Sequence, residues 1–487
     1  MKKLIISLTL FTLLFLLVGC TNDNQGGYID STYVNQYEGE NEHQEIIEQP
    51  FINTEVNNKS NISLSANTAA YSFIRSQILN GMSVNKNAVR VEEMVNFFDY
   101  NYNQPINNDV FGFKAEVFQT PWNEETNILL VGLETKKVDL GNVPNNLVLL
   151  VDVSGSMSAT NKLSLVKQSM KLLVEQMNED DLISLVTYSG KEKIIFKGKS
   201  ANDLEEINKE INGLSAWGGT NGKKGLKMAY EVASELFIDD GNNRIILATD
   251  GDFNLGMSST DELVEYISSK RESGIYFSAF GFGYGNFKDE KLERLAMAGN
   301  GVYHYIDDIL TARKAFIDNI DGLLYTVARD AKAQIIFNSN SVLEFRLIGY
   351  ENRTLSNEQF EDDQTDAGEI GTGLQVTAIY EVKLSDNINE DFASLEIKYK
   401  DHVINNDEVY NNSFIISNNV LTDTPNDDSL FISCVLEFGL ILLDSNYLGT
   451  ANLNSIIERL ESNDYNKYDY YRNDFIELVK KYQKIIA

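Results

Sequence analysis

The stretch from Asn146 to Ser156, Asn-Leu-Val-Leu-Leu-Val-Asp-Val-Ser-Gly-Ser, decides the fold. Its apolar run, which we predict to be a strand over Leu147–Val153, is typical of a strand buried on both faces. Asp152, Ser154 and Ser156 then alternate in a tight turn. In a parallel α/β sheet, the carboxyl end of a strand opens onto the ligand crevice. The stretch therefore predicts an α/β domain with a ligand site at this turn.

The same alternation of short apolar runs and amphipathic periods extends over about 145–322. The clearest helical period begins Leu163, Val166, Met170, with the spacing of one helix face. Such alternation indicates a doubly wound, mostly parallel sheet with helices on both faces. We predict strands at 147–153, 181–188, 193–197, 244–249, 275–281 and 301–306, and helices at 163–177, 203–212, 222–237, 260–271, 289–298 and 309–319.

The regions on either side have different patterns. Residues 51–140 read as two helices followed by strands, 330–418 as an antiparallel β-rich module, and 425–487 as a helical C-terminal region. The strand runs at 107–140 and 330–418 can pair into one antiparallel sandwich. The α/β domain at 145–322 would then be an insertion in that sandwich.

Two further polar groups follow elements of the α/β domain. Thr220 lies in Trp-Gly-Gly-Thr before a predicted helix, and Asp250 lies in Thr-Asp-Gly after a predicted strand. The doubly wound arrangement brings these loops to the sheet edge that carries Asp152, Ser154 and Ser156. Carboxylate and hydroxyl oxygens of low total charge suit Mg²⁺, with Mn²⁺ or Ca²⁺ as alternatives. The sequence thus predicts a divalent-cation site with five protein ligands.

These three motifs, in this order, resemble the metal-ion-dependent adhesion site (MIDAS) of von Willebrand factor type A (VWA) domains, a Rossmann-like fold. The resemblance covers about 145–320. It implies that the five residues hold the ion, partly through water, and that one coordination position stays open for a partner's Asp or Glu. The flanking stretches, such as 88–100 and 346–353, look similar to those of bacterial lipoproteins with a central VWA domain.

The N-terminus carries a second resemblance. Two lysines precede the apolar run Leu4–Val18, and Leu-Val-Gly-Cys20 resembles the lipobox of bacterial lipoproteins. This implies a signal peptide over 1–19, a lipid-modified (diacylglyceryl, palmitate-bearing) Cys20 and a flexible tether over 20–50. The mature protein is then expected on the extracytoplasmic face of the cell membrane, held by its lipid. The alternative is an uncleaved signal anchor.

Composition excludes several functions. Acidic residues outnumber basic ones by 72 to 41, which gives a net charge of −31. Such a chain repels nucleic acid and is not expected to dock on anionic lipid through a basic face. The second cysteine, Cys434, lies in an apolar run and is expected to be a buried, unreactive thiol, so a disulfide-stapled fold is excluded.

The sequence favours a binding protein over an enzyme. None of its three histidines, His43, His304 and His402, lies near a nucleophile motif, and neither Gly-x-Ser-x-Gly nor His-Glu-x-x-His occurs. A binder needs only the ion, the open position and a surrounding surface. The alternative is a metal-dependent hydrolase that uses the same ion.

Three weaker signals lie around the predicted site. Asp252 can add a carboxylate behind the ligands, although a solvated loop acid is favoured. Gly281-Phe-Gly-Tyr-Gly285 is interpreted as a tight loop at the sheet edge that carries the predicted ligands, here called the metal edge. Trp217 can be either an aromatic contact for a partner or a cap on the sheet.

Overall fold

The computed structural model describes residues 45–487 except 108, 140–142, 221, 252–259, 284–288, 387, 389 and 402–407. The predicted signal peptide, Cys20 and residues 20–44 of the predicted tether lie outside the described residues, as do His43, Asp252 and His402. None of the helices that are described is both long and apolar enough to cross a membrane.

The α/β sheet is built around β5 (Asn145–Asp152), which is buried from Asn146 to its end. The strand order is β10-β9-β8-β5-β6-β7 within the described residues. All neighbours run parallel except β7, which pairs antiparallel with β6. The other strands are β6 (Leu182–Tyr188), β7 (Lys193–Ser200), β8 (Asn242–Thr249), β9 (Ile275–Phe282) and β10 (Tyr303–Ile306).

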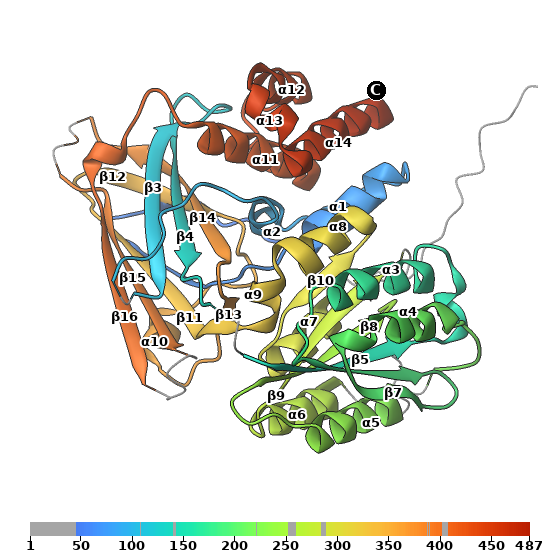
Figure 1. Ribbon diagram of the computed structural model, residues 1–487. Helices are drawn as coiled ribbons and strands as arrows, with labels where there is room; N and C mark the ends of the chain where they lie inside the picture. The colour runs from blue at the N-terminus through green and yellow to red at the C-terminus, as the bar shows by residue number, and fades with distance from the viewer. Residues whose placement is uncertain are drawn as a thin grey trace, which may run out of the picture. The chain divides into compact units, whose positions relative to one another are not determined.

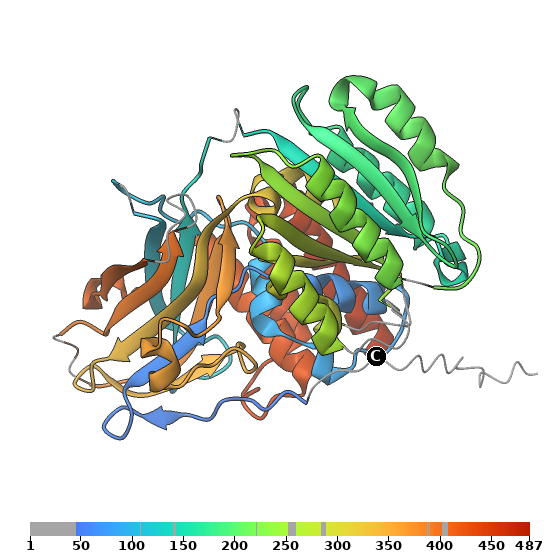
Figure 2. The same ribbon diagram turned by 90° about the horizontal axis from the view of Figure 1, so that it is seen from below.

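Helices cover both faces of this sheet (Figure 2), and each face has its own apolar core. One core takes side chains from α3 (Leu163–Val174), α4 (Leu204–Gly213), α8 (Ile309–Arg313) and α9 (Ile320–Leu324). The other takes them from α5 (Gly222–Glu235), α6 (Thr260–Arg271) and α7 (Asp289–Ala298). The predicted doubly wound α/β fold class is confirmed.

One predicted helix of this domain is interrupted. The sequence predicts a single helix over 309–319, but a π-helical turn, Lys314–Asp318, separates α8 from α9. The Asn319 N–H donates to the Lys314 carbonyl at 3.0 Å, five residues back instead of four. This extra residue changes the direction in which the chain continues to Leu324.

Strands from before and after the α/β domain share one antiparallel sheet. β4 pairs with β14 along its length, from Glu134↔Gln375 to Asn127↔Val382, and Figure 1 shows the cyan β4 beside the orange β14. This sheet has the order β1-β12-β14-β4-β3, and a second has the order β13-β11-β15-β16 with β2 beside β11. A common core lies between them. The α/β domain follows β4 and precedes β11 in the chain.

The elements of this sandwich are β1 (Ile52–Asn53), β2 (Lys59–Ser63), β3 (Phe111–Gln119), β4 (Asn127–Thr135), β11 (Thr326–Phe337), β12 (Val342–Ile348), α10 (Asn357–Glu361), β13 (Gly368–Gly371), β14 (Gln375–Leu384), β15 (Ala393–Asp401) and β16 (Val409–Ile416).

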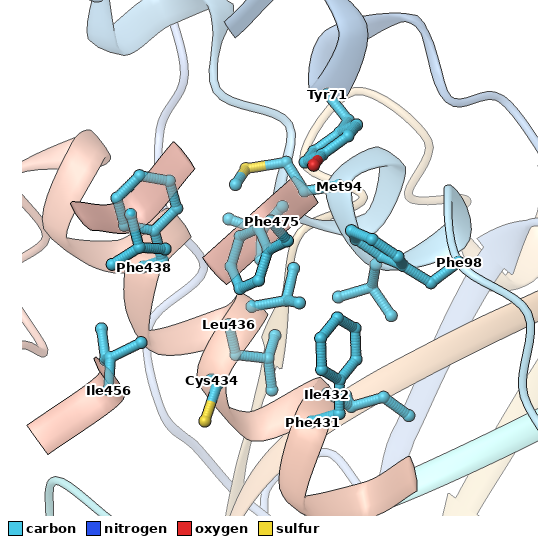
Figure 3. Packing of buried hydrophobic residues seen from close by; sticks show 14 of the residues in the cluster. Tyr71, Met94, Phe98, Phe431, Ile432, Cys434, Leu436, Phe438, Ile456 and Phe475 are labelled. Carbon is cyan, nitrogen blue, oxygen red and sulfur yellow. The ribbon is translucent and has the colours of Figure 1, made fainter. Parts of the chain in front are cut away.

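A helical cluster joins the two ends of the chain. The rings of Phe98, Phe431 and Phe438 lie 5.6–5.7 Å from the ring of Phe475. Figure 3 shows these side chains in the cluster. Cys434 is buried in the same cluster, and burial raises the pKa of its thiol to about 11. The helices are α2 (Val91–Asn96), α11 (Asp427–Leu443), α12 (Leu453–Ser462), α13 (Asp464–Tyr468) and α14 (Tyr470–Ile486).

Helix α1 (Ala69–Leu79) is buried on all sides over Ala69–Ile78. Tyr71 faces the helical cluster, with its ring 5.1 Å from that of Phe98. Phe73 faces the α/β domain, with its ring 5.7 Å from that of Tyr305 in β10. α1 therefore belongs to two cores at once.

The C-terminal end of the predicted tether does not behave as a free linker. Glu48 accepts hydrogen bonds from the Ser445 hydroxyl and, at 2.9 Å, from the Asn446 N–H. The Ile46 N–H donates to the Asn87 side chain at 3.4 Å. The tether predicted to reach residue 50 thus gives way to packed structure by residue 46, because these contacts come from segments far away in sequence.

Candidate metal centre

Three of the predicted ligands form one cluster at the carboxyl end of β5. Asp152 is its last residue and is fully buried. Asp152 Oδ1 accepts the Ser154 N–H at 2.8 Å, which closes the turn. The hydroxyl oxygens of Ser154 and Ser156 lie 3.0 Å apart. The structure therefore gathers one carboxylate and two hydroxyls on a single turn.

The loop that carries Thr220 packs directly on this turn. The Gly155 N–H donates to the Gly218 carbonyl at 3.0 Å, and the Trp217 N–H donates to the Val153 carbonyl at 2.9 Å. Gly218 has φ +87°, a conformation that glycine adopts without strain. Thr220 follows two residues later, half-buried, just before α5. The structure thus brings the Thr220 loop to the Ser154 turn.

Asp250 lies at the end of the neighbouring strand β8 and its carboxylate is buried. Because β8 pairs parallel with β5, the ends of both strands lie at one sheet edge. Asp250 Oδ2 accepts a hydrogen bond from the Lys162 ammonium at 2.8 Å. Sequence reasoning did not identify Lys162, which lies 88 residues from its partner and carries no motif.

The electrostatics of the edge favour a cation. Burial raises the pKa of Asp152 to about 6, and the nearby charge of Asp250 adds to the increase, although hydrogen bonds from Ser154 oppose it. A second positive charge beside these two carboxylates would stabilise their ionised forms. A cation at this edge would therefore oppose the increase that burial causes in the pKa of Asp152.

The donor set fits a hard divalent cation. Two carboxylates and three hydroxyls match the oxygen ligands that Mg²⁺ prefers. No group of three or more His, Cys, Asp or Glu among the described residues is placed to hold a metal. The predicted site instead combines two carboxylates with three hydroxyls. Asp152, Ser154, Ser156, Thr220 and Asp250 would hold the ion, and this role stays a prediction.

Trp217 and His304 differ in their surroundings. Trp217 is 74% exposed, so it does not cap the sheet and stands in solvent beside the Ser154 turn. His304 lies in β10, stacked on Phe280 at 5.4 Å, and burial lowers its pKa to about 4. His304 is a half-buried, neutral side chain, outside the cluster of predicted ligands.

The glycine-rich loop after β9 also reaches this edge. A side chain at Gly283 would collide with the stem of Lys162, at 2.4 Å from its Cγ. Gly283 therefore lets the loop approach the lysine that pairs with Asp250. The rest of the loop, from 284, and Asp252 lie outside the described residues.

Family models match three parts of the chain. The von Willebrand factor type A domain matches residues 146–319, the model described as von Willebrand factor matches 37–130, and the model described as uncharacterized protein YfbK, C-terminal, matches 322–485. The matched α/β region carries all five predicted ligands. A VWA domain suggests a role in protein–protein interaction or adhesion.

Similar proteins come from several organisms. The uncharacterized protein YfbK of Escherichia coli is 34% identical over 466 residues, which cover 90% of this chain and 80% of that protein. The human inter-alpha-trypsin inhibitor heavy chain H3 is 28% identical over 33% of this chain, and the match covers 18% of that protein. A solved structure, von Willebrand factor type A from Catenulispora acidiphila, is 16% identical over 79% of this chain and 91% of its own, with a TM-score of 0.44.

Proposed function

Because this chain belongs to the family of the Escherichia coli protein YfbK and carries a central VWA domain, we propose that it is a membrane-tethered protein-binding module on the extracytoplasmic face. A divalent cation, Mg²⁺ in the first place, would be held at the end of β5. A carboxylate of a protein partner would complete its coordination.

One observation carries the proposal: the predicted ligands are buried to different degrees. Asp152, Ser154 and Asp250 are buried, Thr220 is half-buried, and Ser156 is exposed. An ion beside all five would therefore be enclosed by protein on the Asp152 side and open to solvent on the Ser156 side. An open coordination position is what a partner carboxylate requires.

The geometry supports recognition rather than chemistry on the bound group. The Asp152 carboxylate and the backbone around it are fixed by hydrogen bonds to Ser154 and to the Thr220 loop. A hydrolytic site would also need a positioned general base. Lys162, the basic group nearest in the cluster, is engaged with Asp250 and donates to it. A fixed set of oxygen ligands with an exposed side is sufficient for capture.

The membrane attachment in this proposal comes from the sequence. The lipobox-like Leu17-Val18-Gly19-Cys20 supports a lipid on Cys20. The folded structure begins to make contacts at Ile46, so the free part of the tether would be shorter than the sequence predicted. The VWA domain would be presented by this short tether.

The proposed function is tested by capturing a protein partner from detergent-solubilised envelope. The bait is the chain from residue 21 onward, offered with Mg²⁺ or with chelator. Asp152→Asn removes one carboxylate, and Asp261→Asn is the matched control, because Asp261 is an exposed acid on α6 with a side chain 83% accessible. We expect a partner band with the unaltered chain and the control in Mg²⁺ alone. The same bands in every lane would exclude the metal edge as the contact.

A further inference from the structure

We propose that the segment captured at the metal edge is an acidic peptide segment, read by a lysine rim and by Trp217. The lysine rim consists of Lys191, Lys193, Lys223 and Lys224. This inference rests on the proposed function of the metal edge and names the chemistry of its partner: one carboxylate at the ion, and further Asp or Glu side chains at the lysines.

The charge distribution of the chain points to this edge. Acidic residues exceed basic ones by 31 overall, yet the segments Val153–Val174 and Ile211–Tyr230 contain no Asp or Glu and three lysines each. These two segments carry Ser154, Ser156 and Thr220. Although the whole chain has a surplus of acids, the two segments that contribute to the metal edge are therefore locally basic.

The turn between β6 and β7 brings two more lysines to the same place. A Cβ at Gly218 would lie 3.6 Å from the Gly190 N, and one at Gly190 would lie 3.7 Å from the Gly219 N, so this turn touches the Thr220 loop. Lys191 and Lys193 follow Gly190 directly and both are exposed. Glu192, which lies between the two lysines, is half-buried, so the lysines are the more exposed charges of this turn.

Lys223 and Lys224 are the other two members of the rim. Both are exposed, and they lie in the first turn of α5, which begins at Gly222 and has no acidic residue in that turn. Lysines at a helix N-terminus oppose the helix dipole and so do not stabilise the helix. They add positive charge where α5 begins, two residues after Thr220.

Trp217 gives this face an apolar contact. Its ring is 74% exposed, while its backbone N–H is fixed to the Val153 carbonyl, one residue from Asp152 and Ser154. Exposed tryptophans held on a rigid backbone are frequent hot spots of protein interfaces. A peptide that reaches the ion can therefore lie across the indole.

The net charge of the whole chain does not prevent the approach of an acidic segment. At physiological salt the Debye length is about 8 Å, so charges farther away are largely screened. A segment that reached the ion would lie close to the rim, where these positive charges are screened much less. The same screening predicts that binding weakens as salt is added.

The test measures binding of a synthetic peptide rich in Asp and Glu, by fluorescence anisotropy in Mg²⁺, against the same peptide with Asn and Gln. The rim variant replaces all four lysines by alanine. The matched control replaces four exposed lysines elsewhere, Lys86, Lys137, Lys209 and Lys484, and so changes the net charge equally. Magnesium binding is measured on each protein by calorimetry.

We expect the acidic peptide to bind in Mg²⁺ and the amide peptide to bind much more weakly. The rim variant should lose about tenfold in affinity and most of its salt dependence, because four exposed pairs are removed. The control should stay within about twofold of the unaltered chain. Trp217→Phe should abolish the change in tryptophan emission on binding, since Trp122 is buried.

Other outcomes overturn the inference and separate it from the proposed function. Equal binding by the rim variant and the control, with binding still lost in Asp152→Asn, would exclude the rim but leave ion-bridged capture standing. Equal binding of the acidic and amide peptides would exclude acidic recognition. Binding of duplex DNA or anionic vesicles by the rim without Mg²⁺ would assign it to another class of ligand. Loss of magnesium binding in the rim variant would make the lysines structural.

Discussion

Arg75 of α1 donates a hydrogen bond to Asp307, which follows β10, with 2.5 Å between Nη1 and Oδ2, and both side chains are almost fully buried. The same guanidinium donates to Asp308 at 2.9 Å and to Asp474 of α14 at 2.7 and 3.0 Å. One residue thus links the N-terminal region, the VWA domain and the last helix. A single guanidinium thus faces three carboxylates at this point.

Replacing Arg75 by methionine should destabilise the protein by about 3–5 kcal/mol, because Asp307, Asp308 and Asp474 would lose their shared, buried guanidinium partner. Urea unfolding at neutral pH measures this change. The double variant Arg75→Met, Asp307→Asn should recover part of the loss.

An exposed ion pair provides the comparison for Arg75. Arg294 pairs with Asp261 at 2.7 Å, with side chains 46% and 83% accessible. Arg294→Met should therefore cost less than about 1 kcal/mol. Similar losses for the two arginines would show that the Arg75 cluster does not hold the three parts together.

Magnesium binding should depend on the ionisation of Asp152. Its pKa is raised to about 6 by burial, so the carboxylate is ionised above that pH and protonated below it. Because the ion binds the ionised form, the apparent Kd should be constant from pH 7 to 8 and rise by up to about tenfold per unit below pH 6. Calorimetry across this range checks the prediction. A flat profile through pH 5 would exclude Asp152 as the titrating ligand.

Lys162→Met should lower the melting temperature of the metal-free protein but increase the stabilisation that Mg²⁺ provides. In the absence of Mg²⁺, Asp250 loses its buried partner, and the melting temperature should fall. With Mg²⁺, the ion supplies the missing charge, so the melting temperature should rise more than it does in the unaltered chain, with a lower Kd for Mg²⁺. Lys171→Met, in the same helix α3, is the control. A weaker magnesium affinity in Lys162→Met would instead make Lys162 a residue that positions Asp250.

Thiol counting tests the lipid on Cys20. The chain has two cysteines, and Cys434 is buried with its pKa raised to about 11, so it should not react in the native protein. A lipid-modified protein should show no reactive thiol when folded and one when unfolded. If Cys20 were unmodified, the folded protein would show one reactive thiol and the unfolded protein two. Cys20→Ser should move the protein from the membrane fraction to the soluble fraction, whereas Cys434→Ala should not.

Sequence patterns predict the VWA domain well because its signals are local. The helix predicted at 260–271 has the same bounds in the structure, and β5 ends one residue before the predicted limit. Continuous apolar runs and helical periods are determined by burial on both faces of one sheet. The order of the three site motifs along the chain also places them at one edge, since parallel strands end together.

Elements defined by distant contacts were not predictable in this way. β13 (Gly368–Gly371) has one large apolar residue. β2 contains the buried Asn61, whose side-chain oxygen is satisfied by a hydrogen bond from Gln334 at 2.7 Å. β11 starts four residues before the predicted β-rich module, since Arg329-Asp330 interrupts the apolar pattern and Asp330 has φ +50°. These residues are buried by partners that are distant in sequence, so the local pattern of apolar residues does not predict their burial.

The same limit applies to the site. The five predicted ligands lie in motifs, whereas Lys162 is recognised only through its contact with Asp250, and the exposure of Trp217 depends on how its loop packs. Their charges and positions follow from tertiary structure. Residue types at fixed spacing predict which groups can bind an ion, and packing determines which groups surround it.

Helix α1 has a consequence for protein engineering. It covers β10, the edge strand of the VWA sheet, and contributes Ala69 and Phe73 to the core on that face. The matched VWA region, 146–319, does not include it. A fragment cut to that region would expose an unprotected strand edge and an apolar surface, which favours aggregation. Grafting this domain onto another protein therefore requires residues 69–79 to be supplied as well, as a separate segment that docks beside β10.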